Sequence, residues 1–228
     1  MSAYRRYSIF YTPPEGTALA AFGASWLGWD AGAGRAAVQP AVEGIDALTA
    51  TPRKYGFHGT LKPPFRALGD PADLIPATAH LAGGLVPFDA PALRLTRLGR
   101  FLALSPSAPC RPLADLAFAC VSGLDRFRAP PTETELARRR AAGLSAAQDA
   151  MLRQWGYPYV GAEFRFHLTL TGALDEAQMD GAERALRDLT APFTSDLMAV
   201  TEICLFGEID GGPDDGRFRI IRRFPLCG

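Results

Sequence analysis

This sequence of 228 residues contains few histidines and few cysteines, and it carries no net charge. Lysine and arginine together number 24, which equals the 24 aspartate and glutamate residues, so the formal net charge is zero. A protein that grips long nucleic acid through its phosphates normally carries an excess of basic residues. We therefore expect no long nucleic acid as a partner. If the ligand is anionic, we expect a small molecule that is held by local positive charge.

Long apolar runs and paired cysteines are also missing. No stretch reaches the length of about 18 apolar residues that a membrane span needs, and the first residues, MSAYRRYSIFYTPPEG, contain no apolar run typical of a signal peptide. The four cysteines show no CxxC spacing, which argues against a structural zinc site or a disulfide framework. We expect a cytoplasmic protein with reduced thiols, no membrane contact and no cofactor. The oligomeric state stays open.

Patterns of apolar residues and turn signals predict a mixture of helices and strands. Thr17 is a candidate N-cap, Ser145 can restart a helix after Gly143, and a hairpin is expected to turn near Gly99. Pro63 and Pro64 are expected to end the strand before them. The predicted strands are 7–11, 57–61, 164–171, 197–209 and 218–224, with a hairpin in 92–104, and the predicted helices are 18–29, 70–82, 112–127, 132–155 and 175–189. Residues 49–56 are expected to be irregular.

One short pattern occurs twice. FHGTLKPPF begins at Phe57 and FRFHLTLTG begins at Phe164, and both contain Phe-His-x-Thr-Leu. Two of the three histidines, His58 and His167, lie in this pattern, 109 residues apart, which is close to half the chain. Because the order of predicted elements is also similar in the two halves, we expect a duplicated α+β unit. The interpretation is a single bilobal domain over 1–228, with approximate lobes 1–105 and 106–228 and an exchange of terminal strands left open.

The paired pattern has a clear chemical use. Alternate side chains of a strand share a face, so His58 and Thr60 point one way, as do His167 and Thr169. If two lobes face each other, these four side chains converge on one cleft. One neutral imidazole could take a proton from the attacking group, and one protonated imidazole could give a proton to the leaving oxygen. The threonine hydroxyls could donate to phosphoryl oxygens, and no metal is required. Which histidine is the acid stays open.

These motifs resemble the signature of the two-histidine phosphoesterase superfamily. More narrowly, RRYSIFYTPP, PRKYGFHGTLKPPF, WGYPYV and EFRFHLTLTG resemble an uncharacterised branch associated with phosphonate-utilisation operons. The resemblance implies an α+β fold with a pseudo-twofold axis, in which two antiparallel sheets face a central cleft and helices lie outside. It also implies that His58, Thr60, His167 and Thr169 form the catalytic set. It does not imply a substrate.

Cationic and aromatic residues near the motifs are candidates for substrate binding. Lys62 and Arg165 share the alternation of the two motifs and are expected to face the cleft if the strands extend that far. The other candidates are a cationic rim of Arg53 and Lys54 and a stacking wall that includes Tyr11 and Tyr55. The alternative for all six is solvated charge or packing. His80, in a predicted helix, is interpreted as structural or exposed.

The leading hypothesis is a metal-independent phosphoesterase with two-histidine acid–base catalysis. The expected substrate is a small phosphodiester, with a cyclic one favoured, on a phosphorylated metabolite or nucleotide in the context of phosphonate metabolism. One alternative is a non-catalytic binder of a phosphate or phosphonate metabolite. Another is an RNA-processing 2′,3′-cyclic phosphodiesterase, against which the zero net charge argues. Whether hydrolysis, cyclisation or ligation is the physiological direction stays open.

Overall fold

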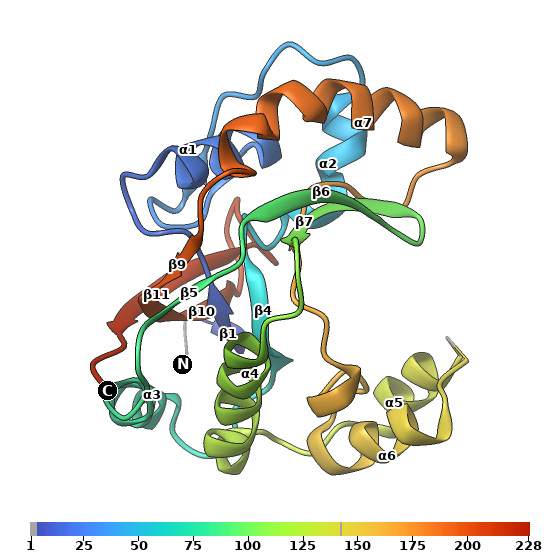
Figure 1. The fold of residues 1–228 in the computed structure, drawn as a ribbon. Helices are drawn as coiled ribbons and strands as arrows, with labels where there is room; N and C mark the ends of the chain where they lie inside the picture. The colour runs from blue at the N-terminus through green and yellow to red at the C-terminus, as the bar shows by residue number, and fades with distance from the viewer. Residues whose placement is uncertain (1–3, 142) are drawn as a thin grey trace.

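Helices and antiparallel strands are mixed along the chain in the computed structural model, which describes residues 4–141 and 143–228 (Figure 1). The predicted α+β class is therefore confirmed. The strands are β1 (Tyr4–Tyr11), β2 (Trp29–Asp30), β3 (Arg35–Ala36), β4 (Gly59–Phe65), β5 (Phe88–Ala90), β6 (Leu93–Leu98), β7 (Phe101–Pro106), β8 (Leu168–Thr169), β9 (Met198–Val200), β10 (Glu202–Ile209) and β11 (Phe218–Pro225). The helices are α1 (Ala18–Leu27), α2 (Ile45–Arg53), α3 (Leu74–Gly83), α4 (Arg111–Gly123), α5 (Glu133–Arg140), α6 (Ala146–Trp155) and α7 (Glu176–Thr190).

Seven strands form the main sheet, in the order β11-β10-β1-β4-β8-β7-β6, and all neighbours are antiparallel. The two antiparallel sheets expected from the resemblance are its halves, β11-β10-β1-β4 and β8-β7-β6. They are joined where Gly59 lies opposite Leu168. Each half of the sheet combines strands from the N-terminal and C-terminal parts of the chain. The C-terminal β10–β11 hairpin lies beside β1, and the β6–β7 hairpin lies beside β8. In Figure 1, α1, α2 and α7 are grouped at one end of the molecule, and the α5–α6 pair lies beside α4.

Local sequence signals fix several element boundaries. The Thr17 hydroxyl accepts a hydrogen bond from the Ala20 backbone N–H at the start of α1, and Ser145 forms a capping box at the start of α6. Gly99 turns the β6–β7 hairpin with φ of +58°, in the left-handed region that favours glycine. These three predictions are confirmed.

Other boundaries differ from the predictions. Helix α2 ends at Arg53 and so occupies most of the segment expected to be irregular. Strand β4 continues through Pro63 and Pro64 to Phe65, because its register with β1 is interrupted and prolines are tolerated at such bulges. Strand β8 has only two residues, fewer than the predicted 164–171.

The main core lies on one face of the sheet. In the first motif Phe57, Gly59 and Leu61 are buried, whereas His58 and Thr60 are only half-buried. The second motif repeats this alternation, so the predicted strand faces are confirmed. Within the described ranges, no helix combines the length and the apolar character that crossing a membrane requires.

Candidate active site

The pairing of β4 with β8 brings the two motifs together. With Gly59 opposite Leu168 in antiparallel register, Thr60 lies opposite His167, and His58 lies opposite Thr169. Side chains of directly opposed residues share a sheet face, with Cβ atoms about 4.5–5.5 Å apart, and diagonal neighbours such as the two histidines lie about 7–8 Å apart. Two histidines and two threonines therefore occupy one patch, related by a local twofold axis through the Gly59–Leu168 pair.

Both imidazole rings are oriented by the same backbone contact. The His58 Nδ1 atom lies 2.8 Å from the carbonyl oxygen of Gly56, and the His167 Nδ1 atom lies 2.8 Å from the carbonyl oxygen of Arg165. A carbonyl oxygen can only accept, so Nδ1 carries the hydrogen in each ring. The Nε2 atom of each neutral ring is thus left with its lone pair, which is the state that a general base needs.

The surroundings of the histidines disfavour their protonated forms. The His58 ring stacks on Phe10 at a centroid distance of 3.9 Å, and Tyr55 lies 5.7 Å away on a tilted plane. Burial lowers the pKa of His58 to about 4, although the hydrogen bond to Gly56 opposes this shift and the charge of His167 adds to it. Burial also lowers the pKa of His167. Both rings are therefore neutral near pH 7 in the free protein, and a bound anion would favour protonation.

A cleft of about 470 Å³ opens beside Thr60 and His167. This volume lies within the range of about 300–1,000 Å³ that is common for small-molecule sites. Thr60 and His167 supply polar groups to its lining. Its apolar wall comes from β7, α4 and the segment before β8, and includes Phe101, Phe118, Tyr157 and Phe164. No local signal marked Phe101, Phe118 or Phe164 as wall residues, because only packing brings α4 and β7 to the motifs.

Two of the predicted binding residues lie at this site. Arg165 is exposed and lines the cleft, and its NH1 atom donates to the carbonyl oxygens of Ala162 and Phe164 at 2.8 and 2.7 Å. Tyr55 is half-buried and stacks on Phe218 at 4.9 Å, beside the His58 ring.

Lys62 and Tyr11 are engaged elsewhere. Lys62 is 1% exposed, and its Nζ atom donates to the Val121 carbonyl oxygen at 3.0 Å and lies 3.7 Å from Asp125. The alternation that predicted a cleft-facing Lys62 breaks at the irregular β1–β4 register. Burial lowers its pKa to about 8. Tyr11 is buried in the main core, and its hydroxyl donates to the Ala199 carbonyl oxygen at 3.2 Å.

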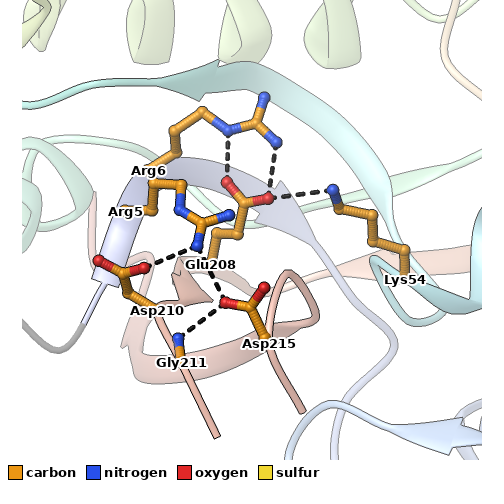
Figure 2. Close-up of polar contacts among 7 residues, drawn as sticks. All are labelled: Arg5, Arg6, Lys54, Glu208, Asp210, Gly211 and Asp215. Carbon is orange, nitrogen blue, oxygen red and sulfur yellow. Dashed lines mark hydrogen bonds and ion pairs between the residues drawn. The ribbon is translucent and has the colours of Figure 1, made fainter. Parts of the chain in front are cut away.

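Arg53 and Lys54 also have structural partners. The Arg53 guanidinium donates to the Leu27 carbonyl oxygen at 2.8 Å and forms an ion pair with Asp46 at 2.9 Å. The Lys54 Nζ atom lies 3.0 Å from the buried carboxylate of Glu208, to which Arg6 also donates (Figure 2). Burial raises the pKa of Glu208, but the hydrogen bonds from Arg6 and Lys54 outweigh it and hold the pKa below its usual value. These two cations are therefore already paired in the free protein.

Comparison with known proteins adds a family and several relatives. The chain belongs to the family described as "Protein of unknown function (DUF1045)", whose model matches residues 60–214. It is 40% identical over 182 residues to a protein named ribose 1,5-bisphosphate phosphokinase PhnN from Janthinobacterium sp. (strain Marseille), covering 77% of this chain and 40% of the relative. A protein of the same name from Laribacter hongkongensis (strain HLHK9) is 36% identical over 180 residues, covering 76% of this chain and 42% of the relative. The sequence-based recognition of an uncharacterised branch is thus confirmed, and the chain spans about two fifths of these relatives.

Solved structures with a similar arrangement include TT0787 of Thermus thermophilus, with a TM-score of 0.49, 16% identity and 98% of both chains covered. E. coli LigT in complex with 3′-AMP gives a TM-score of 0.47, 15% identity and 99% coverage of both chains. A structure titled as a phosphoesterase gives a TM-score of 0.49, 18% identity and 99% coverage of both chains. Similarity at this level says nothing of what the present chain binds.

Proposed function

We propose that this protein is a metal-independent phosphoesterase that hydrolyses a small phosphodiester, most readily a cyclic one. The observation that carries the proposal is the antiparallel pairing of Gly59 with Leu168, because it gathers two histidines and two threonines on one sheet face. The shared Nδ1 contacts support the proposal, since they leave each Nε2 atom available for proton transfer.

In the proposed reaction, one Nε2 atom takes a proton from water while the water oxygen forms a bond to phosphorus. The bond from phosphorus to the ester oxygen breaks, and the other imidazole, protonated when the anion binds, gives its proton to that oxygen. Attack and departure occur on opposite sides of phosphorus, which the local twofold arrangement of the histidines accommodates. The Thr60 and Thr169 hydroxyls donate hydrogen bonds to the non-bridging oxygens, where negative charge is held.

The size and lining of the cleft favour a small substrate. A wall of phenylalanine and tyrosine side chains suits a sugar or nucleoside carrier. The name of the PhnN relatives refers to a phosphorylated ribose, which motivates the inclusion of ribose cyclic phosphates among the substrates tested. We also propose that the protein acts in the cytoplasm, in phosphonate metabolism.

The test is turnover in the presence of a chelator. The panel would contain 2′,3′-cyclic nucleotides, ribose cyclic phosphates, linear diesters and an oligonucleotide that ends in a cyclic phosphate. Hydrolysis of a small cyclic diester, lost in His58→Ala, would support the proposal. Binding of the same compounds without turnover would favour the alternative of a non-catalytic binder, and preference for the oligonucleotide would favour RNA processing.

A further inference from the structure

A second, smaller cavity lies near the candidate active site, and arginine dominates its lining. Its volume is about 50 Å³. One water molecule accounts for about 30 Å³ of the liquid, so the cavity has room for a compact group such as a tetrahedral anion. The charged side chains around it are those of Arg6, Arg66, Arg128, Arg138, Arg139 and one carboxylate, Glu135.

Three of these arginines are compensated by carboxylates. Their ion pairs are Arg6 with Glu208 at 2.9 Å (Figure 2), Arg66 with Glu135 at 3.4 Å, and Arg128 with Asp125 at 2.7 Å. Each of these three guanidinium groups therefore has a carboxylate partner, although Glu208 also pairs with Lys54 and Asp125 also pairs with Lys62.

The remaining two, Arg138 and Arg139, have no carboxylate within ion-pair distance among the residues that the structure describes. Arg138 is exposed, whereas Arg139 is half-buried, with its guanidinium carbon 5.1 Å from the centroid of the Tyr157 ring. Burial lowers the pKa of Arg139, and the positive charges of Arg138 and Arg6 add to this effect, whereas Tyr157 and the Glu135 carboxylate oppose it. Arg138 and Arg139 therefore lack an ion-pair partner of their own, and Arg139 is partly removed from water, which is costly without an anion.

Aromatic residues connect this cavity to the candidate active site. Tyr157, on which Arg139 packs, also lines the main cleft. Tyr55 interacts with both Tyr157 and Arg6, and its ring centroid lies 5.7 Å from that of His58. Tyr55 and Tyr157 thus link the arginine cavity to the His58 ring and to the main cleft.

We propose that Arg138 and Arg139 bind a second phosphate group of the substrate while its diester phosphorus lies between His58 and His167. This inference rests on the proposed function. A phosphomonoester carries a charge of about −1.5 to −2 at pH 7, which matches the two positive charges of Arg138 and Arg139, whereas a carboxylate supplies one negative charge. The planar guanidinium fork also suits phosphate oxygens. The substrate class is a sugar or nucleoside cyclic phosphate that carries a phosphomonoester on another hydroxyl.

A matched substrate pair tests the inference. Adenosine 2′,3′-cyclic phosphate and its 5′-phosphorylated form, and the corresponding ribose pair, would be compared by kcat/KM. We expect the wild type to prefer the phosphorylated member, and Arg139→Gln to reduce that preference by about 10- to 100-fold, the scale of hydrogen bonds to a charged group. The control is Arg140→Gln, which removes the same charge from the next residue of α5, where the guanidinium is paired with Asp149. An equal loss on both substrates, or an unchanged preference, would overturn the inference.

A binding experiment keeps this inference separate from the catalytic proposal. Inorganic phosphate would be titrated into protein labelled with ¹⁵N, and the arginine Nε resonances would be followed in the wild type and in the Thr60→Val, Thr169→Val double variant. A shift of the Arg139 resonance that persists in the double variant would support an independent anion site even if no diester is hydrolysed. If phosphate leaves the Arg139 resonance unchanged in both proteins, the site does not exist.

Discussion

Gly59 lies directly opposite Leu168 where β4 and β8 pair, and the absence of a side chain at Gly59 makes room for the Phe166 ring. A Cβ atom at this glycine would come within 2.4 Å of the Phe166 Cε2 atom. The contact therefore links the two motifs through packing as well as through the sheet. The same contact explains why the middle residue of the Phe-His-x-Thr-Leu pattern is glycine in the first motif and leucine in the second.

The first prediction concerns this contact. Gly59→Ala should lower the free energy of unfolding by about 1–3 kcal/mol, the usual cost of overpacking, and should reduce turnover by displacing one motif from the other. Urea unfolding measures the first effect. Gly83→Ala is the control, because a Cβ there meets no atom within 4 Å. Adding Phe166→Leu to Gly59→Ala should recover part of the stability. A Gly59→Ala protein as stable as the wild type would contradict the prediction, because it would show that the Phe166 ring moves aside without cost.

The second prediction concerns the two histidines. His58→Ala and His167→Ala should each lower kcat by about two to four decades, the scale of general acid–base catalysis. The fold should persist, because both side chains are only half-buried. The double variant should lose less than the product of the single losses, since residues that act as a unit are not additive. His80→Ala, on an exposed position of α3, should keep the wild-type rate. Wild-type rates in both single variants would refute the assignment.

The third prediction concerns the hydroxyl groups of the motifs. Thr60→Val and Thr169→Val keep the shape of the side chain and remove its hydrogen-bond donor. Each should weaken transition-state stabilisation by about 1–4 kcal/mol, measured as a fall in kcat/KM. The serine variants at the same positions retain the hydroxyl and should keep most of the activity. If valine and serine variants behave alike, the hydroxyl groups do not contact the reacting phosphoryl group.

The fourth prediction concerns pH. Because the pKa of His58 is about 4 in the folded protein and about 6.5 in an unfolded chain, the unfolded state binds more protons between these values. The free energy of unfolding is therefore at its full value above about pH 6.5, and it decreases as the pH falls toward 4. Urea unfolding at several pH values should show this loss, and His58→Gln should reduce it.

The same titration reports on ligand binding. An NMR titration of the imidazole nitrogens should give a low pKa for His58, and saturating phosphate should raise it, because a nearby anion favours the imidazolium. A pKa near the ordinary value, unchanged by phosphate, would contradict the buried and anion-binding environment described for this ring.

The fifth prediction concerns metal ions. Within residues 4–141 and 143–228, no group of three or more histidine, cysteine, aspartate or glutamate side chains is arranged to hold a metal. Dialysis against EDTA should therefore leave the rate of diester hydrolysis unchanged. Loss of activity that Mg²⁺, Mn²⁺ or Zn²⁺ restores would argue against acid–base catalysis by the histidines alone.

Local sequence determined the parts of this protein that depend on neighbouring residues. Alternation placed His58 and Thr60 on the same face of their strand, because successive side chains of a strand point to opposite sides. In the same way, Thr17 marked the start of α1, and Gly99 marked the turn of the β6–β7 hairpin. Each of these depends on backbone geometry within a few residues, which the sequence carries directly.

Only the tertiary structure decided what each strand face meets. The register of β4 with β8 sets which residue of one motif lies opposite which residue of the other, and two-residue β8 gave no strong signal of its own. Lys62 has the same sequence parity as His58 and Thr60, yet the alternation breaks at the irregular pairing with β1, and Lys62 is buried against Val121 and Asp125. Arg139 could be found only after α5 had been placed beside Tyr157. Contacts between distant segments depend on register and packing, and no local pattern encodes them.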